Sequence, residues 1–221
     1  MEQVSEHVYV ETGLFACNLG LITTEAGNVL IDTPMRPGDA VRWRERVSEK
    51  GTVRYLITTE EHPDHTTTTH FFPGTLISHE KTRERLAQVP HAETLDLVRH
   101  VDPEANSLLA GFRLRLADIV FKEKLSLYCG DVTLQLFHLP GHSAGGIGVY
   151  LPEDKVVFTT DIVFHRKKSW LHEATPAQWL ESLQKLRELD AAVIVPGHGR
   201  LCRNDYLEEQ ASIVERWVEV V

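Results

Sequence analysis

The sequence predicts an α/β protein, classed as α+β in some schemes, in which two β-sheets pack face to face with helices outside them. Two observations support this four-layer αββα sandwich. Short apolar strands and amphipathic helices alternate in both halves of the 221-residue chain, and an irregular segment over residues 90–118 separates the halves. No linker rich in proline, glycine or serine divides the chain. We therefore expect one domain over residues 1–221.

The first half is expected to begin as a β-meander and to continue as alternating strands and helices. The turn at residues 26–28 separates two early strands, and Gly51 lies just past the end of a helix that begins at Asp39, after a break over Pro34 to Gly38. We expect strands over residues 8–11, 18–24, 29–32, 53–58 and 75–78, and helices over residues 39–50 and 80–88.

The second half repeats this pattern after the irregular segment, in which we expect one short helix. Gly130 and Asp131 form a turn between two strands, and Thr175 with Pro176 is typical of a helix N-cap followed by its first residue. We expect strands over residues 119–121, 125–129, 132–138, 146–151, 156–160 and 192–195, and helices over residues 176–189 and 205–220.

The composition favours a cytoplasmic protein that acts on a small molecule. Lysine and arginine number 23 against 32 acidic residues, a formal charge of −9, which argues against nucleic acid or an anionic membrane as the main partner. No run approaches the roughly 18 apolar residues of a membrane span, and Met1 to Val10 lacks the pattern of a signal peptide. The three cysteines, Cys17, Cys129 and Cys202, are too few and too scattered for a disulfide framework.

Residues of the types that bind metals follow directly after the strand expected over residues 53–58. They are Glu60, His62, Asp64 and His65. In an extended chain alternate side chains share one side, so Glu60, His62 and Asp64 are expected to point together. His65 then turns in from the following backbone, and Glu61 faces away. Imidazole and carboxylate groups are ligands of zinc, iron and manganese.

Three further candidates each follow the end of another expected strand. His142 lies in Leu-Pro-Gly-His-Ser, Asp161 in Thr-Thr-Asp, and His198 in Val-Pro-Gly-His-Gly. A single histidine of this kind is more often a solvated or scaffold residue, and we interpret His70, His79 and His138 in that way. Loops at strand ends are where a rigid sheet presents functional groups, so the candidates together predict a metal site.

These motifs in combination resemble the signature of the metallo-β-lactamase superfamily, which is His-x-His-x-Asp-His followed by a distant His, Asp and His. The resemblance extends from about Thr12 to His198. It implies the αββα metallo-β-lactamase fold with metals at one edge, and it likens Asp32 to the family's structural aspartate. The implied ligands are Glu60, His62 and His142 for a first metal, and Asp64, His65 and His198 for a second, with Asp161 bridging the two.

The chain departs from this signature at Glu60, where the family has histidine, and in the run of threonines over residues 66–69, where many relatives carry glycine or alanine. With Glu60, three carboxylates oppose the four positive charges of two divalent metals. The additional carboxylate should make a bound water less acidic and favour a harder metal. We expect two divalent ions, with zinc first and iron or manganese as alternatives. A weak Glu60 site would leave a single metal.

The resemblance implies a hydrolase that uses a metal-bound hydroxide to attack a small ester, thioester or lactone, with β-lactams among the candidates. A bound metal lowers the pKa of water from 15.7 towards about 7. Asp64 is the expected catalytic residue, because it can orient the hydroxide or take its proton. Two alternatives stay open: an iron-dependent oxidoreductase of the same fold, and a non-catalytic metal-binding protein.

The segment after Asp161 is expected to line the mouth of the site. Its candidate substrate-lining residues are Phe164, His165 and Lys168, with Arg166, Lys167 and Trp170 beside them. The alternative for this segment is a solvated basic loop. The apolar face of residues 206–221 packs on the sheet or serves a homodimer interface.

Overall fold

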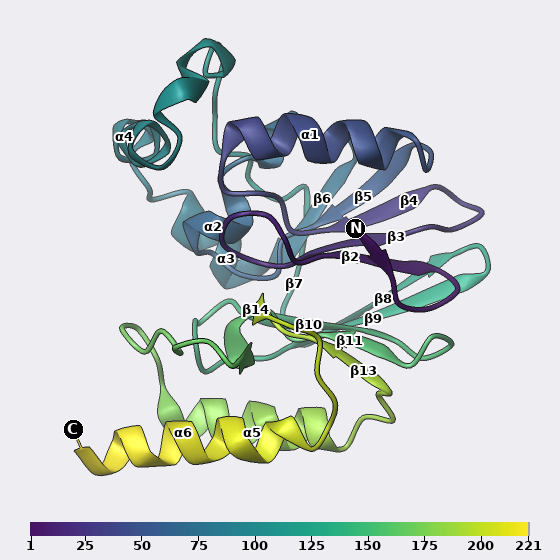
Figure 1. Ribbon diagram of the computed structural model, residues 1–221, viewed down its shortest axis with the longest axis vertical. Helices are drawn as coiled ribbons and strands as arrows, with labels where there is room; N and C mark the ends of the chain where they lie inside the picture. Colours follow the sequence, from purple (N-terminus) through teal and green to yellow (C-terminus); the bar gives the residue numbers. More distant parts are fainter. Residues whose placement is uncertain (221) are drawn as a thin grey trace.

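The computed structural model describes residues 1–220 and has the αββα architecture expected from the sequence. Figure 1 shows two sheets stacked at the centre of the molecule, with α1 (Pro37–Ser48) on the outer face of one sheet and α5 (Pro176–Arg187) and α6 (Tyr206–Val220) on the outer face of the other. Residue 221 lies outside the described residues; it is the last residue of the expected domain and of the apolar face expected over residues 206–221.

The first sheet has seven strands in sequence order. Its first four strands pair antiparallel, and each later strand adds in parallel through a helical or irregular crossover. The strands are β1 (Glu2–Gln3), β2 (Val8–Glu11), β3 (Leu19–Ile22), β4 (Asn28–Ile31), β5 (Val53–Ile57), β6 (Thr75–His79) and β7 (Ile119–Phe121).

The second sheet has five strands in the order β13-β11-β10-β9-β8, and its β11–β13 pair is parallel. They are β8 (Lys124–Cys129), β9 (Val132–His138), β10 (Ile147–Leu151), β11 (Val156–Phe158) and β13 (Val193–Val195). A small parallel pair, β12 (Phe164–His165) with β14 (His198–Gly199), lies beside this sheet.

The core lies between the two sheets, with a further apolar layer under the helices of each half. Ile31 and Ile57 of the first sheet belong to the same buried cluster as Leu134 and Val149 of the second. Trp43 of α1 and Trp179 of α5 are fully buried in the outer layers. Each fully buried aliphatic side chain of this core stabilises the fold by roughly 1.5–3 kcal/mol relative to its exposed state. The loops at the sheet ends are therefore attached to a well-packed core.

Two expectations about helices were wrong. Helix α1 begins at Pro37, inside the segment expected to break the chain, because proline is well tolerated in the first turn of a helix, where its missing N–H has no partner. The segment over residues 90–118 is more regular than expected. It holds the eleven-residue helix α4 (His91–Val101) and the 3-10 helix η2 (Pro103–Leu108), which are separated by non-helical backbone at Asp102.

The remaining differences concern element ends and very short elements. Helix α3 covers Glu80–Leu86, two residues less than expected, and the other ends shift by one or two residues, as frayed ends commonly do. Elements this short span too few residues for a periodic pattern to be reliable. The short elements missed are β1, β12, β14, α2 (Pro63–Thr66), η1 (Thr69–Phe71) and η3 (Thr160–Ile162).

No helix among residues 1–220 combines the length and the apolar character needed to cross a membrane.

Candidate metal centre

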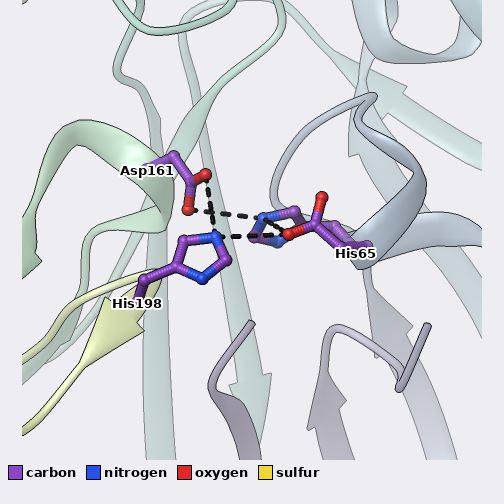
Figure 2. A group of neighbouring side chains, drawn as sticks. His65, Asp161 and His198 are labelled. Carbon is purple, nitrogen blue, oxygen red and sulfur yellow. Dashed lines mark hydrogen bonds and ion pairs between the residues drawn. The ribbon is translucent and has the colours of Figure 1, made fainter. Parts of the chain in front are cut away.

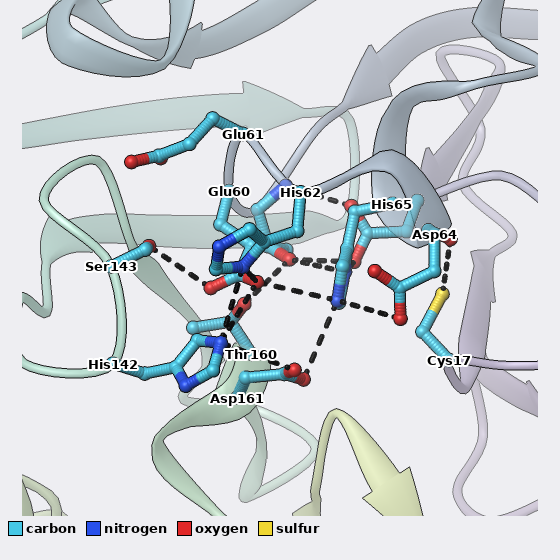
Figure 3. A network of polar contacts seen from close by, with 12 residues as sticks. Cys17, Glu60, Glu61, His62, Asp64, His65, His142, Ser143, Thr160 and Asp161 are labelled. Atoms are coloured by element: carbon cyan, nitrogen blue, oxygen red, sulfur yellow. Dashed lines mark hydrogen bonds and ion pairs between the residues drawn. The ribbon is translucent and has the colours of Figure 1, made fainter. Parts of the chain in front are cut away.

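The loops that carry the candidate ligands converge at one edge of the two sheets. Glu60 follows β5, His142 follows β9, Asp161 follows β11 and His198 follows β13. Figure 3 shows side chains from the first half, among them Glu60, facing His142 and Asp161 from the second half. The site is therefore assembled across the interface of the two sheets.

A first cluster contains Glu60, His62 and His142, whose ligand atoms lie within 4.8 Å of one another. Glu60 Oε1 is 2.6 Å from His62 Nδ1 and 3.5 Å from His142 Nε2, and the two histidine nitrogens are 3.1 Å apart. Glu60 is completely buried, and its other oxygen accepts a hydrogen bond from the Ser143 hydroxyl at 3.0 Å.

A second cluster contains Asp64, His65, Asp161 and His198. His198 Nε2 lies 3.1 Å from Asp161 Oδ2 and 3.2 Å from Asp64 Oδ2. His65 Nε2 lies 3.4 Å from Asp161 Oδ1. Figure 2 shows His65, Asp161 and His198 turned toward one common point.

Asp161 connects the two clusters. Its Oδ2 atom lies 3.5 Å from His142 Nε2 of the first cluster and 3.1 Å from His198 Nε2 of the second. Glu60 Oε1 likewise lies 3.6 Å from His65 Nε2. The two donor sets are thus contiguous, as a pair of metals sharing one carboxylate requires.

The loop from Glu60 to His65 reaches this geometry in a way that differs from the expectation of a wholly extended segment. His62 is extended, but Pro63 starts the single helical turn α2, so Asp64 and His65 are presented by helical backbone. The Cys17 thiol also donates to the Asp64 carbonyl at 3.0 Å. Proline sets φ near the helical value, which explains why the extended conformation ends there.

Asp32 orients His65 from behind. Its Oδ2 atom lies 2.8 Å from His65 Nδ1, while its Oδ1 accepts the Thr59 backbone N–H at 2.7 Å. Such a carboxylate fixes the tautomer of a ligand histidine and leaves Nε2 free to face a metal. Asp32 thus has the structural role that the sequence resemblance implies for it, and it adopts a left-handed backbone conformation, with φ 57°, to do so.

Within residues 1–220, two buried polar atoms of the second cluster, His65 Nε2 and Asp161 Oδ1, have no hydrogen-bond partner. Buried polar atoms are normally satisfied, and an ion at the point they face would satisfy both. The donors are imidazole nitrogens and carboxylate oxygens, which suit zinc, iron and manganese. The residues present therefore fit a divalent metal pair.

Two histidines of the clusters have raised pKa values because of the carboxylates beside them. Burial opposes charge on His62, yet its hydrogen bond with Glu60 raises its pKa to about 9. Burial also opposes charge on His198, whose contacts with Asp161 and Asp64 raise its pKa to about 10. Metal binding at these two histidines would therefore release protons.

Comparison with known proteins identifies the family. A family model described as the metallo-beta-lactamase superfamily matches residues 12–198. The chain belongs to this superfamily. It is therefore a metallo-hydrolase by family, and the matched residues contain both clusters.

Among the relatives of this superfamily member is the hydroxyacylglutathione hydrolase of Brucella canis, 28% identical over 216 residues, which cover 96% of this chain and 70% of that protein. A metallo-beta-lactamase from Pontibacter korlensis has a TM-score of 0.76 at 20% identity, with 97% of both chains covered. A metallo-beta-lactamase family protein from Thermus thermophilus has a TM-score of 0.75 at 20% identity, covering 97% of this chain and 81% of that one. These structures share the fold.

The metal centre of this metallo-hydrolase opens into a cleft of about 1370 Å³. Phe164, His165 and Lys168, the residues expected to line the mouth, all border it. Phe164 is almost fully buried, and its ring stacks on that of the candidate ligand His198 with centroids 5.1 Å apart. His165 lies with Nδ1 2.8 Å from the Arg200 carbonyl oxygen, and Lys168 is exposed.

The cleft also has walls that the sequence did not predict. Leu14, Phe15, Met35 and Leu97 contribute apolar surface from the first half of the chain. They lie far from the ligands in sequence and belong to ordinary residue types, so no local signal pointed to them. Sequence reasoning also missed Ser143, which contacts Glu60 and not the cleft; its position directly after His142 in the Pro-Gly-His-Ser motif is a signal that could have been used.

The histidines interpreted as scaffold residues are indeed outside the clusters. His138 Nε2 lies 3.0 Å from the Ala144 carbonyl oxygen, and its ring stacks on that of His79 at 4.1 Å. His79 Nε2 lies 2.7 Å from the Lys122 carbonyl oxygen. His70 packs against Phe71, and burial lowers its pKa to about 4.

Glu61 points away from the clusters, as expected, but is buried (Figure 3).

Proposed function

We propose that this metallo-hydrolase cleaves thioesters whose thiol part is negatively charged, and that two divalent metals serve the reaction. The observation that carries the proposal is Asp161, which contacts both donor clusters at the base of a cleft with a cationic wall. The relatives named hydroxyacylglutathione hydrolase support a thioester as the substrate.

The first metal would be held by Glu60, His62 and His142, the second by Asp64, His65 and His198, with Asp161 shared. When bound, such metals supply hydroxide from water near neutral pH and polarise the carbonyl under attack. Zinc is the first candidate.

Asp64 is the proposed catalytic residue. Its side chain is about one-fifth exposed at the cleft, whereas Glu60 and Asp161 are almost fully buried. Burial opposes its charge, yet His65 and His198 lower its pKa below the ordinary value. The carboxylate is therefore ionised near neutral pH, where it can orient the attacking water and accept its proton.

The thiol part of the substrate would lie along the cationic wall. Arg166, Lys167, Lys168 and Arg200 border the cleft, and the acidic residues bordering it in the described chain, Asp64 and Asp161, belong to the metal clusters. In a protein with a formal charge of −9 this is a local reversal of sign. Such a wall attracts an anion and stabilises the thiolate that departs.

A substrate panel tests this proposal. The purified protein, loaded with zinc, is assayed on a hydroxyacylglutathione thioester, a neutral thioester, a lactone and a chromogenic β-lactam. We expect the highest kcat/KM for the anionic thioester, with KM rising as salt is added because the wall is screened. Equal rates on neutral and anionic thioesters would contradict the role of the wall, and activity confined to the β-lactam would contradict the substrate class.

An iron-dependent oxidoreductase is the second candidate, because the carboxylate of Glu60 in place of histidine favours a harder metal than zinc. Loading the protein with ferrous iron and measuring oxygen consumption separates the two. Oxygen consumption without thioester hydrolysis would favour this second function.

A further inference from the structure

The two carboxylate oxygens of Glu60 lie in different surroundings. Oε1 faces the histidines, at 2.6 Å from His62 Nδ1 and 3.5 Å from His142 Nε2. Oε2 is turned away from them and accepts the hydroxyl of Ser143 at 3.0 Å. Glu60 is 0% exposed and Ser143 is 4% exposed, so water does not compete for this bond. Figure 3 shows the Ser143 hydroxyl beside Glu60, on the side opposite His65.

A glutamate in the place of a histidine needs such a partner. A neutral imidazole in a given tautomer presents one acceptor nitrogen, whereas a carboxylate has two equivalent oxygens on a longer, more flexible side chain. It can bind a metal through one oxygen, through both, or rotate away. A hydroxyl that donates to one oxygen makes a charge-assisted bond and removes this freedom.

Ser143 is itself held firmly. Glu61, the neighbour of Glu60, accepts the backbone N–H of Gly145 at 3.3 Å and the hydroxyl of Thr82 at 3.2 Å. The same Thr82 hydroxyl lies 3.0 Å from the Gly145 carbonyl oxygen. Two consecutive glutamates thus bind the segment after His142, one through Ser143 and one through Gly145. This explains why Glu61 is buried although it faces away from the clusters.

We infer that Ser143 is a positioning residue that fixes Glu60 as a ligand through Oε1 alone and so sets the affinity of the first metal site. The inference rests on the proposed metal centre. In it, Ser143 compensates for the glutamate that stands at position 60 where the family signature has histidine. Ser143 touches neither the cleft nor the second cluster through its hydroxyl, so its effect should be confined to the first site.

The test measures Zn²⁺ affinity of the 221-residue chain by competition with a chromophoric chelator, together with the visible spectrum of the Co²⁺-loaded protein. Ser143→Ala should weaken one of the two sites by about 10- to 100-fold, the usual effect of removing a residue that supports a ligand, and should alter the Co²⁺ spectrum. Ser143→Thr keeps the hydroxyl and should retain affinity, whereas the similarly shaped Ser143→Val should lose it. Ser78→Ala, which removes a buried serine hydroxyl from β6, is the control.

A second background makes the test specific to Glu60. In Glu60→His, which restores the family's residue, adding Ser143→Ala should change Zn²⁺ affinity by less than about threefold, because no carboxylate remains to be oriented. Equal losses in both backgrounds, or no loss in either, would overturn the inference. A wild-type chain that binds no Zn²⁺ would instead overturn the metal centre itself, and because no substrate is used, failure of the thioester proposal leaves this test intact.

Discussion

Single residues decide whether two metals can share this site, and Asp161 contacts His142 of the first donor cluster and His198 of the second through the same oxygen. Its two oxygens lie between His65, His142 and His198. Those three histidines come from loops far apart in the chain. The carboxylate follows a left-handed residue, Thr160 with φ 45°, so the local backbone is adapted to present it.

Asp64 should be indispensable. Asp64→Ala removes a ligand of the second cluster and the proposed proton acceptor at once, so kcat/KM should fall by at least about 100-fold, the lower range for loss of a general base. The metal content of the second site should fall as well. Steady-state kinetics and metal analysis measure both effects. Asp190→Asn, at an exposed ion pair with Lys155, is the control. Survival of both activity and metal content in Asp64→Ala would show that the site is wrongly assigned.

Gly197 should be required for the position of Asp161. A Cβ atom at residue 197 would come within 1.8 Å of Asp161 Oδ1 and 2.8 Å of the Thr160 backbone. Gly197→Ala should therefore displace the shared carboxylate, with loss of metal and about a 100-fold drop in kcat/KM. Metal analysis and kinetics are compared with Gly38→Ala, where the nearest atom is a side-chain oxygen at 3.3 Å. Unchanged metal content in Gly197→Ala would argue against Asp161 as a ligand.

The candidate ligand residues, which the fold brings together in two clusters, could be chosen from the sequence because their types and strand-end positions are local signals. The orientation of Asp64 and His65 could not, since it depends on the four-residue turn α2 that begins at Pro63. The partnership of Ser143 with Glu60 spans 83 positions in the chain, and only the folded structure brings the two together.

At the level of elements, the candidate ligands follow strand ends, while a loop of the first sheet contacts turns of the second sheet through its side chain. His7, in the loop between β1 and β2, has Nδ1 3.0 Å from Asp154 Oδ2, in the β10–β11 turn. Its Nε2 lies 3.2 Å from Asp131 Oδ2, in the β8–β9 turn. One side chain of the first sheet thus contacts both of these turns of the second sheet.

The contact of His7 should make stability depend on pH. Burial opposes charge on His7, but the hydrogen bond with Asp154 raises its pKa above the ordinary 6.5. Protonated His7 therefore stabilises the fold fully below about pH 6.5, and this contribution is lost as the pH rises through the raised pKa. His7→Gln should lower Tm by about 2 °C at pH 5.5 and by less at pH 8.5, measured by thermal melts. An equal change in Tm at both pH values would contradict this ion pair.

Strands and helices long enough to show a period were predictable within one or two residues, as β9 and α5 illustrate. The small β12–β14 pair was not, although it sets Phe164 beside His198. Two-residue strands leave no periodic signal. The eleven-residue α4 was underestimated because Pro90 and Pro103 suggested irregular chain. In the structure Pro90 is the N-cap of α4 and Pro103 is the first residue of η2.

At the scale of the whole molecule, the metal centre joins the two halves. The first half contributes Glu60, His62, Asp64 and His65, and the second contributes His142, Asp161 and His198. The alternation of strands and helices in both halves was enough to predict the sandwich. Only the part of the cleft that follows Asp161 was predictable, because the other walls join residues as distant as Leu14 and Arg200.

Metal removal should therefore destabilise the whole fold. A ligand present at about 1,000 times its Kd stabilises the native state by about 4 kcal/mol, which corresponds to a Tm shift of about 10 °C for a chain of this size. Thermal melts before and after dialysis against a chelator measure the shift, and added Zn²⁺ should restore the original Tm. A Tm that chelation leaves unchanged would argue that the clusters hold no structurally coupled metal.

The most direct test of a two-metal thioesterase is the initial rate of hydrolysis of a hydroxyacylglutathione thioester as metal-free protein is titrated with Zn²⁺. We expect no measurable rate without metal and a rise that ends at two equivalents per chain. A rate in the metal-free protein equal to that of the loaded protein, or no hydrolysis at any loading, would contradict the proposal.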